Sequence, residues 1–267
     1  MTNELRILSV FLTVDGEANV WGPGHWSVFV RTAGCTVGCH WCDTKYSWNA
    51  KGGEAFSTPE LVDTVKRIGG EVRKVTLTGG EPLEQSWPAL HDFLKELLMA
   101  NYNVAVETAG TQNTIQFRNE LQLRMPSFQF ALGQLTFVVD YKLSSSRYKG
   151  TMDLEHFSAL RRGDVVKFVI GSLEDFNEAA KIAHHLDKRS QFMAGMYFSP
   201  CEGGEWTNSD LFYAMKKSGL DQIGVGYNLQ AHKYIFPHTF RDEEEGGVDF
   251  SKASLGREEF LKRMKED

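Results

Sequence analysis

Residues 74–82, KVTLTGGEP, join a short β-rich run to a turn made of two glycines, a glutamate and a proline. Valine, leucine and threonine favour a strand, and the glycines and proline end it. A strand that runs directly into such a turn is typical of one unit in a repeated strand and helix alternation. Further runs of this kind are therefore expected on either side.

Similar runs recur at intervals of roughly thirty residues, the size of a βαβ unit. They are 103–108 (NVAVET), 135–140 (LTFVVD), 165–170 (VVKFVI), 192–198 (FMAGMYF) and 222–227 (QIGVGY). Several are nearly continuous in apolar residues, which predicts burial on both faces of a parallel sheet. We predict an α/β fold, a partial (β/α) barrel of largely parallel strands covered by helices.

Helical patterns fill the intervals between these runs. Thr58 is predicted to cap the first helix and Gly69 to end it. Leucines at helical spacing mark a second helix over residues 90–98, and Ser172 with Asp175 three residues later marks the start of another. The apolar stripes of these helices predict packing against the sheet and no chemistry.

The length and composition favour one large domain with a short tail. We expect the barrel over residues 1–240 and an acidic C-terminal extension over 241–267, with a short charged helix near its end. The net charge of -6 argues against a nucleic-acid partner. The apolar run near the N-terminus predicts a strand, and no run is long enough to cross a membrane. We expect a soluble cytoplasmic protein.

Polar and glycine-rich sequences stand at the end of each predicted strand. In a parallel barrel, functional groups gather at the carboxyl ends of the strands and in the loops that follow. These ends are TGGEP (78–82), ETAGT (107–111), VDYKLSSS (139–146), SPCEGG (199–204) and YNLQAHK (227–233). The sequence therefore predicts a site at this edge of the sheet.

Three of the four cysteines, Cys35, Cys39 and Cys42, have the spacing C-x3-C-x2-C on one loop. Three thiolates can hold three irons of a [4Fe-4S] cluster and leave the fourth iron open to a small molecule. Closed clusters and structural zinc sites use four protein ligands. A zinc site stays an alternative, with His40 or His25 as the fourth ligand.

This spacing, with Trp41 directly before the last cysteine, resembles the radical S-adenosylmethionine (SAM) superfamily. TGGEP resembles the superfamily's glycine-rich strand end that binds the SAM amino group, where we expect the glycines to let backbone approach the ligand. The resemblance implies a [4Fe-4S] cluster whose open iron binds SAM. It also implies that the reduced cluster cleaves SAM to a 5'-deoxyadenosyl radical, with a flavodoxin or ferredoxin as the electron donor.

Within the superfamily, the chain is similar to the 7-carboxy-7-deazaguanine synthase family of queuosine and 7-deazapurine biosynthesis. The motifs, in the family's order, are TVDGEANVWGPGHWSVFVRTAGC, CDT, TGGEPLEQ, ETAGT, VDYKLSSS, VVKFVIGSLEDF and NLQAHKY. The resemblance implies a carbon-nitrogen lyase that converts 6-carboxy-5,6,7,8-tetrahydropterin to 7-carboxy-7-deazaguanine with loss of ammonia. It also implies Mg2+ as a further cofactor and a homodimer.

The resemblance implies a role for residues in each motif. The predicted pterin contacts are Val14, Asp15, Gly16, Glu17, Arg31 and Thr78. The predicted SAM contacts are Trp41, Gly80, Asp140, Tyr141, Lys142, Ser199, Pro200, Cys201 and Glu202. The predicted metal ligands are Cys35, Cys39 and Cys42 for the cluster and Thr44 for Mg2+. Arginine suits the substrate carboxylate as a two-pronged donor, and glutamate suits the amino-pyrimidine donors.

The chain departs from the family pattern at several points. Asp15 stands where the family usually has Gln, so an acceptor-only carboxylate replaces an amide. Two extra residues separate Glu17 from Arg31, and VDYK replaces the more usual Ser-Pro-Lys. About thirty residues follow Pro237, near which family members end. The pterin contacts around Asp15 are therefore expected to be rearranged.

Two alternatives remain at this stage. A radical SAM activase, which makes a glycyl radical on a partner enzyme, shares the cysteine loop and GGEP but needs no acid and arginine set for a pterin. A non-catalytic zinc or cluster-binding module would make the strand-end motifs a coincidence. Metal content and turnover of the pterin separate these alternatives from the lyase.

Overall fold

The computed structural model describes residues 4–128, 131, 133–231 and 235. This part of the chain forms one nine-stranded sheet in the order β3-β1-β2-β4-β5-β6-β7-β8-β9. Its strands are β1 (Glu4–Val14), β2 (Trp26–Thr32), β3 (Glu54–Ser57), β4 (Lys74–Gly79), β5 (Asn103–Thr108), β6 (Leu135–Tyr141), β7 (Val165–Ile170), β8 (Gly195–Pro200) and β9 (Gly226–Tyr227). Neighbours from β2 to β9 are parallel, whereas β1 is antiparallel to β2 and β3. The predicted α/β fold with a largely parallel, unclosed sheet is confirmed.

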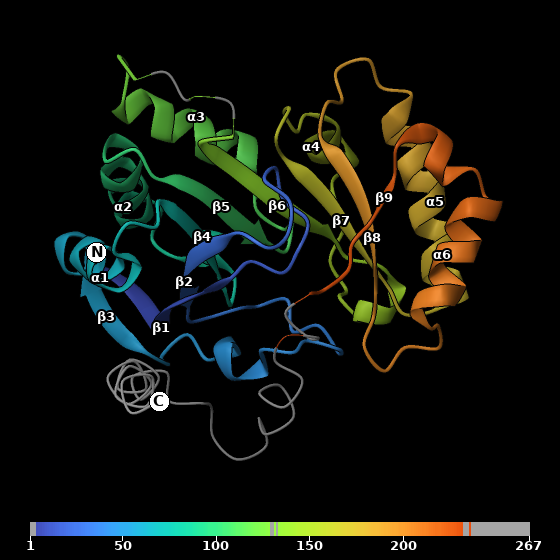
Figure 1. Ribbon diagram of the computed structural model, residues 1–267, viewed down its shortest axis with the longest axis horizontal. Helices are drawn as coiled ribbons and strands as arrows, with labels where there is room; N and C mark the ends of the chain where they lie inside the picture. Colours follow the sequence, from blue (N-terminus) through green and yellow to red (C-terminus); the bar gives the residue numbers. More distant parts are fainter. Residues whose placement is uncertain (1–3, 129–130, 132, 232–234, 236–267) are drawn as a thin grey trace, which may run out of the picture.

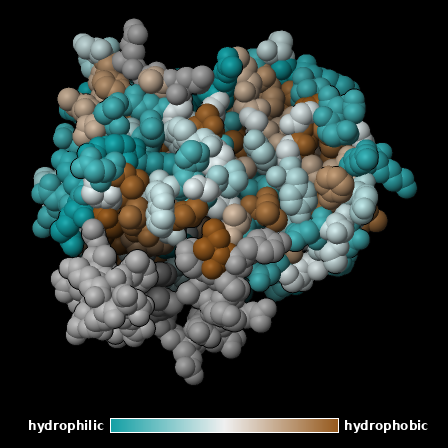
Figure 2. Space-filling model, viewed as in Figure 1, coloured by the Kyte–Doolittle hydropathy of each residue, from teal (hydrophilic) through white to brown (hydrophobic). Residues whose placement is uncertain are grey.

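Helices cover the outer side of this curved sheet, with α1 and α2 near one edge and α5 and α6 near the other (Figure 1). They are α1 (Thr58–Gly69), α2 (Trp87–Met99), α3 (Thr114–Arg124), α4 (Leu154–Ser158), α5 (Leu173–Asp187) and α6 (Asn208–Lys217). Figure 2 shows a largely hydrophilic surface over α5 and α6, while apolar side chains gather where β1 and β2 lie. Among the described residues, no helix is long and apolar enough to cross a membrane.

Most predicted strands are confirmed, and the misplaced boundaries have local causes. β4, β5 and β7 coincide with the predicted runs, and the expected N-terminal strand is β1. The prediction over 222–227 was wrong for its first half, where a 3-10 helix (Leu220–Ile223) lies between two left-handed glycines, Gly219 and Gly224. The run over 192–198 begins too early, because Phe192 closes a turn on Arg189 and β8 starts at Gly195.

The caps of two helices can be compared with their predictions. Ser57, not Thr58, caps α1, because Ser57 and Glu60 form a reciprocal capping box one residue earlier than expected. Ser172 caps α5 as predicted and accepts a hydrogen bond from the amide of Asp175. The predicted extension 241–267 and its charged helix lie outside the described residues.

The alternation of side chains along each strand gives the sheet two different faces. On β4, Val75 and Leu77 belong to the apolar core under the helices. Lys74, Thr76 and Thr78 point to the opposite, concave face, where Lys74 and Thr76 are also buried. Both faces are covered, as predicted, but the inner one is polar. The inward positions of the strands therefore decide which side chains reach the site.

Candidate active site

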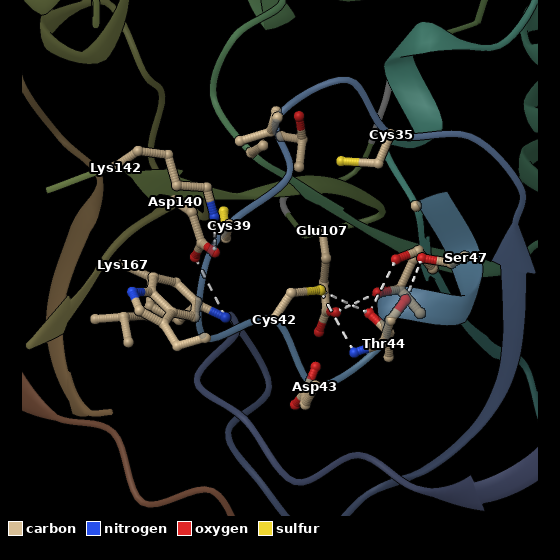
Figure 3. A pocket seen from close by; sticks show the side chains of 18 of the residues that line it. Cys35, Cys39, Cys42, Asp43, Thr44, Ser47, Glu107, Asp140, Lys142 and Lys167 are labelled. Carbon is tan, nitrogen blue, oxygen red and sulfur yellow. Dashed lines mark hydrogen bonds and ion pairs between the residues drawn. The ribbon is translucent and has the colours of Figure 1, made fainter. Parts of the chain in front are cut away.

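A pocket lies at the carboxyl ends of the parallel strands, with a cavity of about 170 Å³. Most of the predicted site residues line it. These are Glu17, Cys35, Cys39, Trp41, Cys42, Thr44, Thr78, Gly80, Asp140, Lys142, Pro200, Cys201 and Glu202. Figure 3 shows Lys142, Asp140 and Lys167 on one side of this pocket, Thr44 and Ser47 on the other, and Cys42 and Glu107 between them. Segments nearly 200 residues apart in sequence therefore meet at one place, as the strand ends of a parallel sheet must.

Backbone hydrogen bonds within the cysteine loop fix its conformation. The amide of Gly34 donates to Ser47 O at 2.7 Å, and that of Cys42 to Cys39 O at 3.0 Å. The thiols of Cys35, Cys39 and Cys42 form no disulfide, and the amide of Thr44 points at the Cys42 sulfur from 3.4 Å. Burial raises the pKa of the Cys35 and Cys39 thiols, so these thiols need a bound cation to ionise. Three reduced sulfurs on one pocket wall suit an iron-sulfur cluster.

The glycines of GGEP bring the end of β4 against the cysteine loop. A side chain at Gly79 would collide with the backbone of Thr32, and one at Gly80 with the carbonyl of Gly34. The amides of Gly80 and Glu81 donate to those same two residues, at 2.9 and 2.7 Å. The glycines thus allow two protein segments to approach closely, in addition to the approach to a ligand that the sequence predicts.

Glu81 of the same motif is a structural tie. Its buried carboxylate accepts hydrogen bonds from the amides of Leu83 and Ala109 and from Thr108 Oγ1, at 2.9, 2.5 and 2.8 Å. Burial, only partly offset by these bonds, raises the pKa of Glu81 to about 7. The ends of β4 and β5 are fixed to each other through this one side chain.

Trp41 docks the cysteine loop onto the loop that follows β6. Its ring nitrogen donates to Ser145 Oγ at 3.2 Å, and the amide of His40 donates to Ser146 O at 2.9 Å. The ammonium of Lys142 lies 5.3 Å from the centre of the Trp41 ring, within range of a cation-π contact. The predicted SAM segment at 140–142 is therefore in contact with the predicted cluster segment.

Four charged side chains alternate in sign across the pocket. Lys167 Nζ lies 2.6 Å from Glu17 Oε2 and 3.3 Å from Asp140 Oδ1, and Lys142 Nζ lies 2.8 Å from Asp140 Oδ2. Figure 3 shows Lys142 and Lys167 both reaching toward Asp140. Burial alone would lower the pKa of Lys167, but Asp140, Glu17 and Glu107 raise it well above its ordinary value. Lys167 is therefore a permanent cation in the pocket.

Sequence reasoning assigned no role to two charged residues of this site, Lys167 and Glu107, although Glu107 lies in a predicted strand end. Each interrupts or ends an apolar strand at an inward position, a signal that the sequence carried in VVKFVI and NVAVET. Thr78 Oγ1 donates to Glu107 Oε2 at 2.6 Å. Burial and the nearby charge of Glu17 raise the pKa of Glu107 to about 7.

The structure places some predicted site residues outside the pocket lining. The carboxylate of Asp15 is buried and binds Lys74 Nζ and Thr76 Oγ1, each at 2.9 Å, so it is used within the protein. Tyr141 points to the helix side of β6, where its ring lies 5.0 Å from that of Phe157, because Asp140 and Lys142 occupy the inward positions. The side chains of Asp15 and Tyr141 are thus part of the protein interior.

Arg31 and Ser199 lie on the inner face but do not line the pocket. Arg31 stands beside Thr78 in the β2 and β4 ladder, with its guanidinium 5.5 Å from the Phe11 ring centre. Among the described residues it has no carboxylate partner. Ser199 Oγ is buried and accepts from Asn228 Nδ2 at 3.2 Å.

The segment after β9 closes the site by binding the segment after β1. The amide of Ala18 donates to Asn228 Oδ1 at 2.8 Å, and the amide of Ala231 donates to Gly16 O at 2.9 Å. Gln230 Nε2 donates to Glu17 Oε1 at 3.1 Å. Val14 ends β1 just before this segment and is not part of the pocket lining. Glu17 is therefore held in part by the segment after β9, 213 residues away in sequence.

Comparison with known proteins defines the class. The family model described as "4Fe-4S single cluster domain" matches residues 20–161, which include all three clustered cysteines. The crystal structure of QueE from Escherichia coli shares the fold, with a TM-score of 0.61 and 21% sequence identity over 86% of this chain and 95% of that one. Together with the curated relatives described next, these matches make the chain a radical SAM enzyme with a [4Fe-4S] domain.

Two relatives that cover most of the chain define the family. The 7-carboxy-7-deazaguanine synthase of Clostridium acetobutylicum is 32% identical over 86% of this chain and 96% of its own length. The synthase of Koribacter versatilis is 28% identical over 88% of this chain and 99% of its own. This chain belongs to the 7-carboxy-7-deazaguanine synthase family. The predicted family is confirmed, and the activase and zinc-module alternatives are set aside.

Proposed function

We propose that this chain converts 6-carboxy-5,6,7,8-tetrahydropterin to 7-carboxy-7-deazaguanine with loss of ammonia, using a [4Fe-4S] cluster, SAM and Mg2+. The observation that best supports this function is that one pocket is lined by Cys35, Cys39 and Cys42, by the glycine-rich end of β4 and by the carboxylate of Glu17. When bound, the reduced cluster and SAM together supply the power to remove a hydrogen atom from the substrate. The protein's own part is to bind, orient and shield the pterin.

The proposed pterin site combines carboxylates that line the pocket with Arg31, which lies beside the pocket on the inner face of the sheet. Glu17, held by Lys167 and Gln230, accepts hydrogen bonds from the amino-pyrimidine. Arg31, which lacks a carboxylate partner within the described part of the chain, supplies a two-pronged donor to the substrate carboxylate. Thr78, tied to Glu107, faces the same space.

The segment around Glu17 completes this side. Val14 and Gly16 are proposed to touch the pterin, Gly16 through its amide, since Gly16 O already accepts from the amide of Ala231. Asp15 is proposed to hold the segment in place through Lys74. Replacing the usual Gln by this buried ion pair accounts for the rearrangement that the sequence predicts at this position.

The cluster and SAM side lies toward β6 and β8. Cys35, Cys39 and Cys42 would hold the cluster, and SAM would lie along Trp41, Gly80, Asp140, Lys142, Pro200, Cys201 and Glu202. Asp140 Oδ1 supports this placement, because it is buried and accepts no hydrogen bond within the described residues. Tyr141 is proposed to support the SAM site through the packing of β6. Ser199 is proposed to support it from β8, through its hydrogen bond with Asn228.

Thr44 is proposed as the Mg2+ ligand. Its hydroxyl makes only long contacts, at 3.4 Å to Gly79 O and 3.5 Å to Cys42 Sγ, so the oxygen can turn to a metal ion. Mg2+ prefers oxygen ligands with several waters, and the substrate carboxylate would supply another. A flavodoxin or ferredoxin as reductant, a homodimer and a cytoplasmic location complete the proposal.

The test is an anaerobic assay of the reconstituted protein. Iron and sulfide are restored, the cluster is reduced, and SAM is added with the carboxylated tetrahydropterin. We expect a product whose mass is lower by one ammonia and which absorbs as a deazaguanine. Cleavage of SAM with an unchanged pterin mass would reject the proposed substrate, and a preparation with one zinc and no iron would reject the cluster.

A further inference from the structure

Lys167 lies between the proposed pterin site and the proposed SAM site. Its ammonium is 2.6 Å from Glu17, on the pterin side, and 3.3 Å from Asp140, on the SAM side. It stands at an inward position of β7, a strand buried along its whole length, so its backbone is rigid. Glu17, in contrast, lies in the loop between β1 and β2, so its backbone is not fixed by strand pairing.

We propose that Lys167 is a positioning residue, which keeps Glu17 turned into the pocket as a charged acceptor for the pterin and ties that acceptor to Asp140. The inference rests on the proposed function, because it takes Glu17 as the pterin contact. Lys167 itself is assigned no contact with the substrate. Its effect on binding passes through the carboxylate that it holds.

The charges around Glu17 explain why a cation is needed at this position. Asp15 lies two residues away on the same segment, Glu107 faces it from β5, and Asp140 faces the same space from β6. Asn228 and Gln230 add only neutral amides. Lys142 is also near, but its ammonium is bound to Asp140. Without Lys167, several carboxylates would face one another in a poorly solvated space.

This arrangement predicts a specific dependence on pH. Loss of the neighbouring cation favours the neutral form of Glu17, so that Glu17 takes up a proton more readily as the pH falls. A protonated Glu17 offers fewer acceptor sites to the amino-pyrimidine. The pterin affinity of a Lys167 variant, divided by that of the wild type, should therefore fall as the pH falls. Titration of the pterin itself cancels in this ratio.

The experiment measures the dissociation constant of the carboxylated tetrahydropterin on the oxidised, SAM-loaded holoenzyme by anaerobic calorimetry at pH 6, 7 and 8. For Lys167→Met we expect a loss of about 10-fold or more at pH 6, with a smaller loss at pH 8, as for a hydrogen bond to a charged group. Lys167→Arg keeps the cation and should stay within about 3-fold of the wild type at each pH. If the Met variant does not retain the cluster, Lys167→Gln takes its place.

Two controls separate positioning from general damage. In a Glu107→Gln background, which removes the other carboxyl that titrates near pH 7, Lys167→Met should keep its pH-dependent loss, and adding Glu17→Gln should abolish that loss. Arg118→Met removes a buried cation near the other end of the sheet, outside the pocket lining, and should lower stability with no pH trend in pterin affinity. An equal loss at all three pH values, or a pH trend that persists without Glu17, would overturn the proposal. Failure of the wild type to bind the pterin would instead overturn the proposed function.

Discussion

Two buried ion-pair networks lie in the same sheet and differ in what is left for a ligand. Near the amino ends of β6 and β7, Asp164 receives both terminal nitrogens of Arg118, at 3.0 and 2.6 Å, and the amides of Phe137 and Arg161, each at 2.9 Å. At the carboxyl ends, Lys167 and its partners line an open pocket. Burial of charge alone therefore does not mark a site.

The difference lies in how completely each carboxylate is used. Asp164 has four donors and almost no exposed surface, so its network can only hold the strands together. Asp140 Oδ1, in contrast, lies 3.3 Å from Lys167 Nζ but accepts no hydrogen bond within the described part of the chain, and Glu17 faces the cavity. We infer that the first network serves the fold and the second serves ligands, and the following changes test that division.

The largest effect is expected at the saturated network. Asp164→Ala leaves Arg118 buried without a counter-charge and strands two backbone amides, which should cost about 3–5 kcal/mol of stability. Denaturant unfolding of the variant and the wild type measures this loss. Any folded variant should bind the pterin with unchanged affinity. A loss below about 1 kcal/mol, the usual range for an exposed pair, would show that this network does not hold the fold.

The next effect is expected at the pocket. Glu17→Gln removes the charged acceptor, so pterin affinity should fall about 10- to 100-fold, the range for a hydrogen bond to a charged group of about 1.5–3 kcal/mol. Calorimetry on the SAM-loaded protein gives the affinity, and the cluster absorbance should stay unchanged. Unaltered affinity would remove Glu17 from the pterin site and would make the two networks alike.

A smaller effect concerns stability against pH. The folded chain holds the proton of Glu107 up to about pH 7, whereas an unfolded glutamate releases it near 4.5. The folded state thus binds more protons between these values, so its stability falls as the pH rises from 4.5 to 7 and levels off above. Glu107→Gln should make the stability depend less on pH over this range. Each kcal/mol of stability that no longer varies with pH corresponds to about 2–4 °C in melting midpoint. Glu81 contributes a similar slope in both proteins, so part of the fall must remain.

The smallest effect is expected for Tyr141. Its ring lies against Phe157 and Phe168 on the helix side of β6, away from both charge networks. Tyr141→Phe should therefore change SAM affinity by less than about 2-fold and stability by under about 0.5 kcal/mol, as for a substitution that removes no contact. A larger change in SAM affinity would mean that the Tyr141 hydroxyl reaches the pocket. Tyr141 would then not point to the helix side of β6.

The sequence predicted the fold well because strand composition and helix caps are local signals. The runs at β4, β5 and β7 and the cap at Ser172 needed no knowledge of partners. The cysteine loop and GGEP were likewise visible as motifs. Lys167 was not assigned, because a lone lysine in an apolar run gains its meaning only from Glu17, 150 residues away. The engagement of Asp15 with Lys74 was hidden for the same reason.

A crystal structure of the reconstituted protein with SAM and the carboxylated tetrahydropterin bound would test the division between the two networks most directly. We predict that the pterin amino groups lie against Glu17, that Lys167 still bridges Glu17 and Asp140, and that SAM lies between Asp140 and the cluster. The pair of Arg118 and Asp164 should be unchanged. A pterin bound away from Glu17, or Lys167 turned out of the pocket, would contradict the division between the two networks.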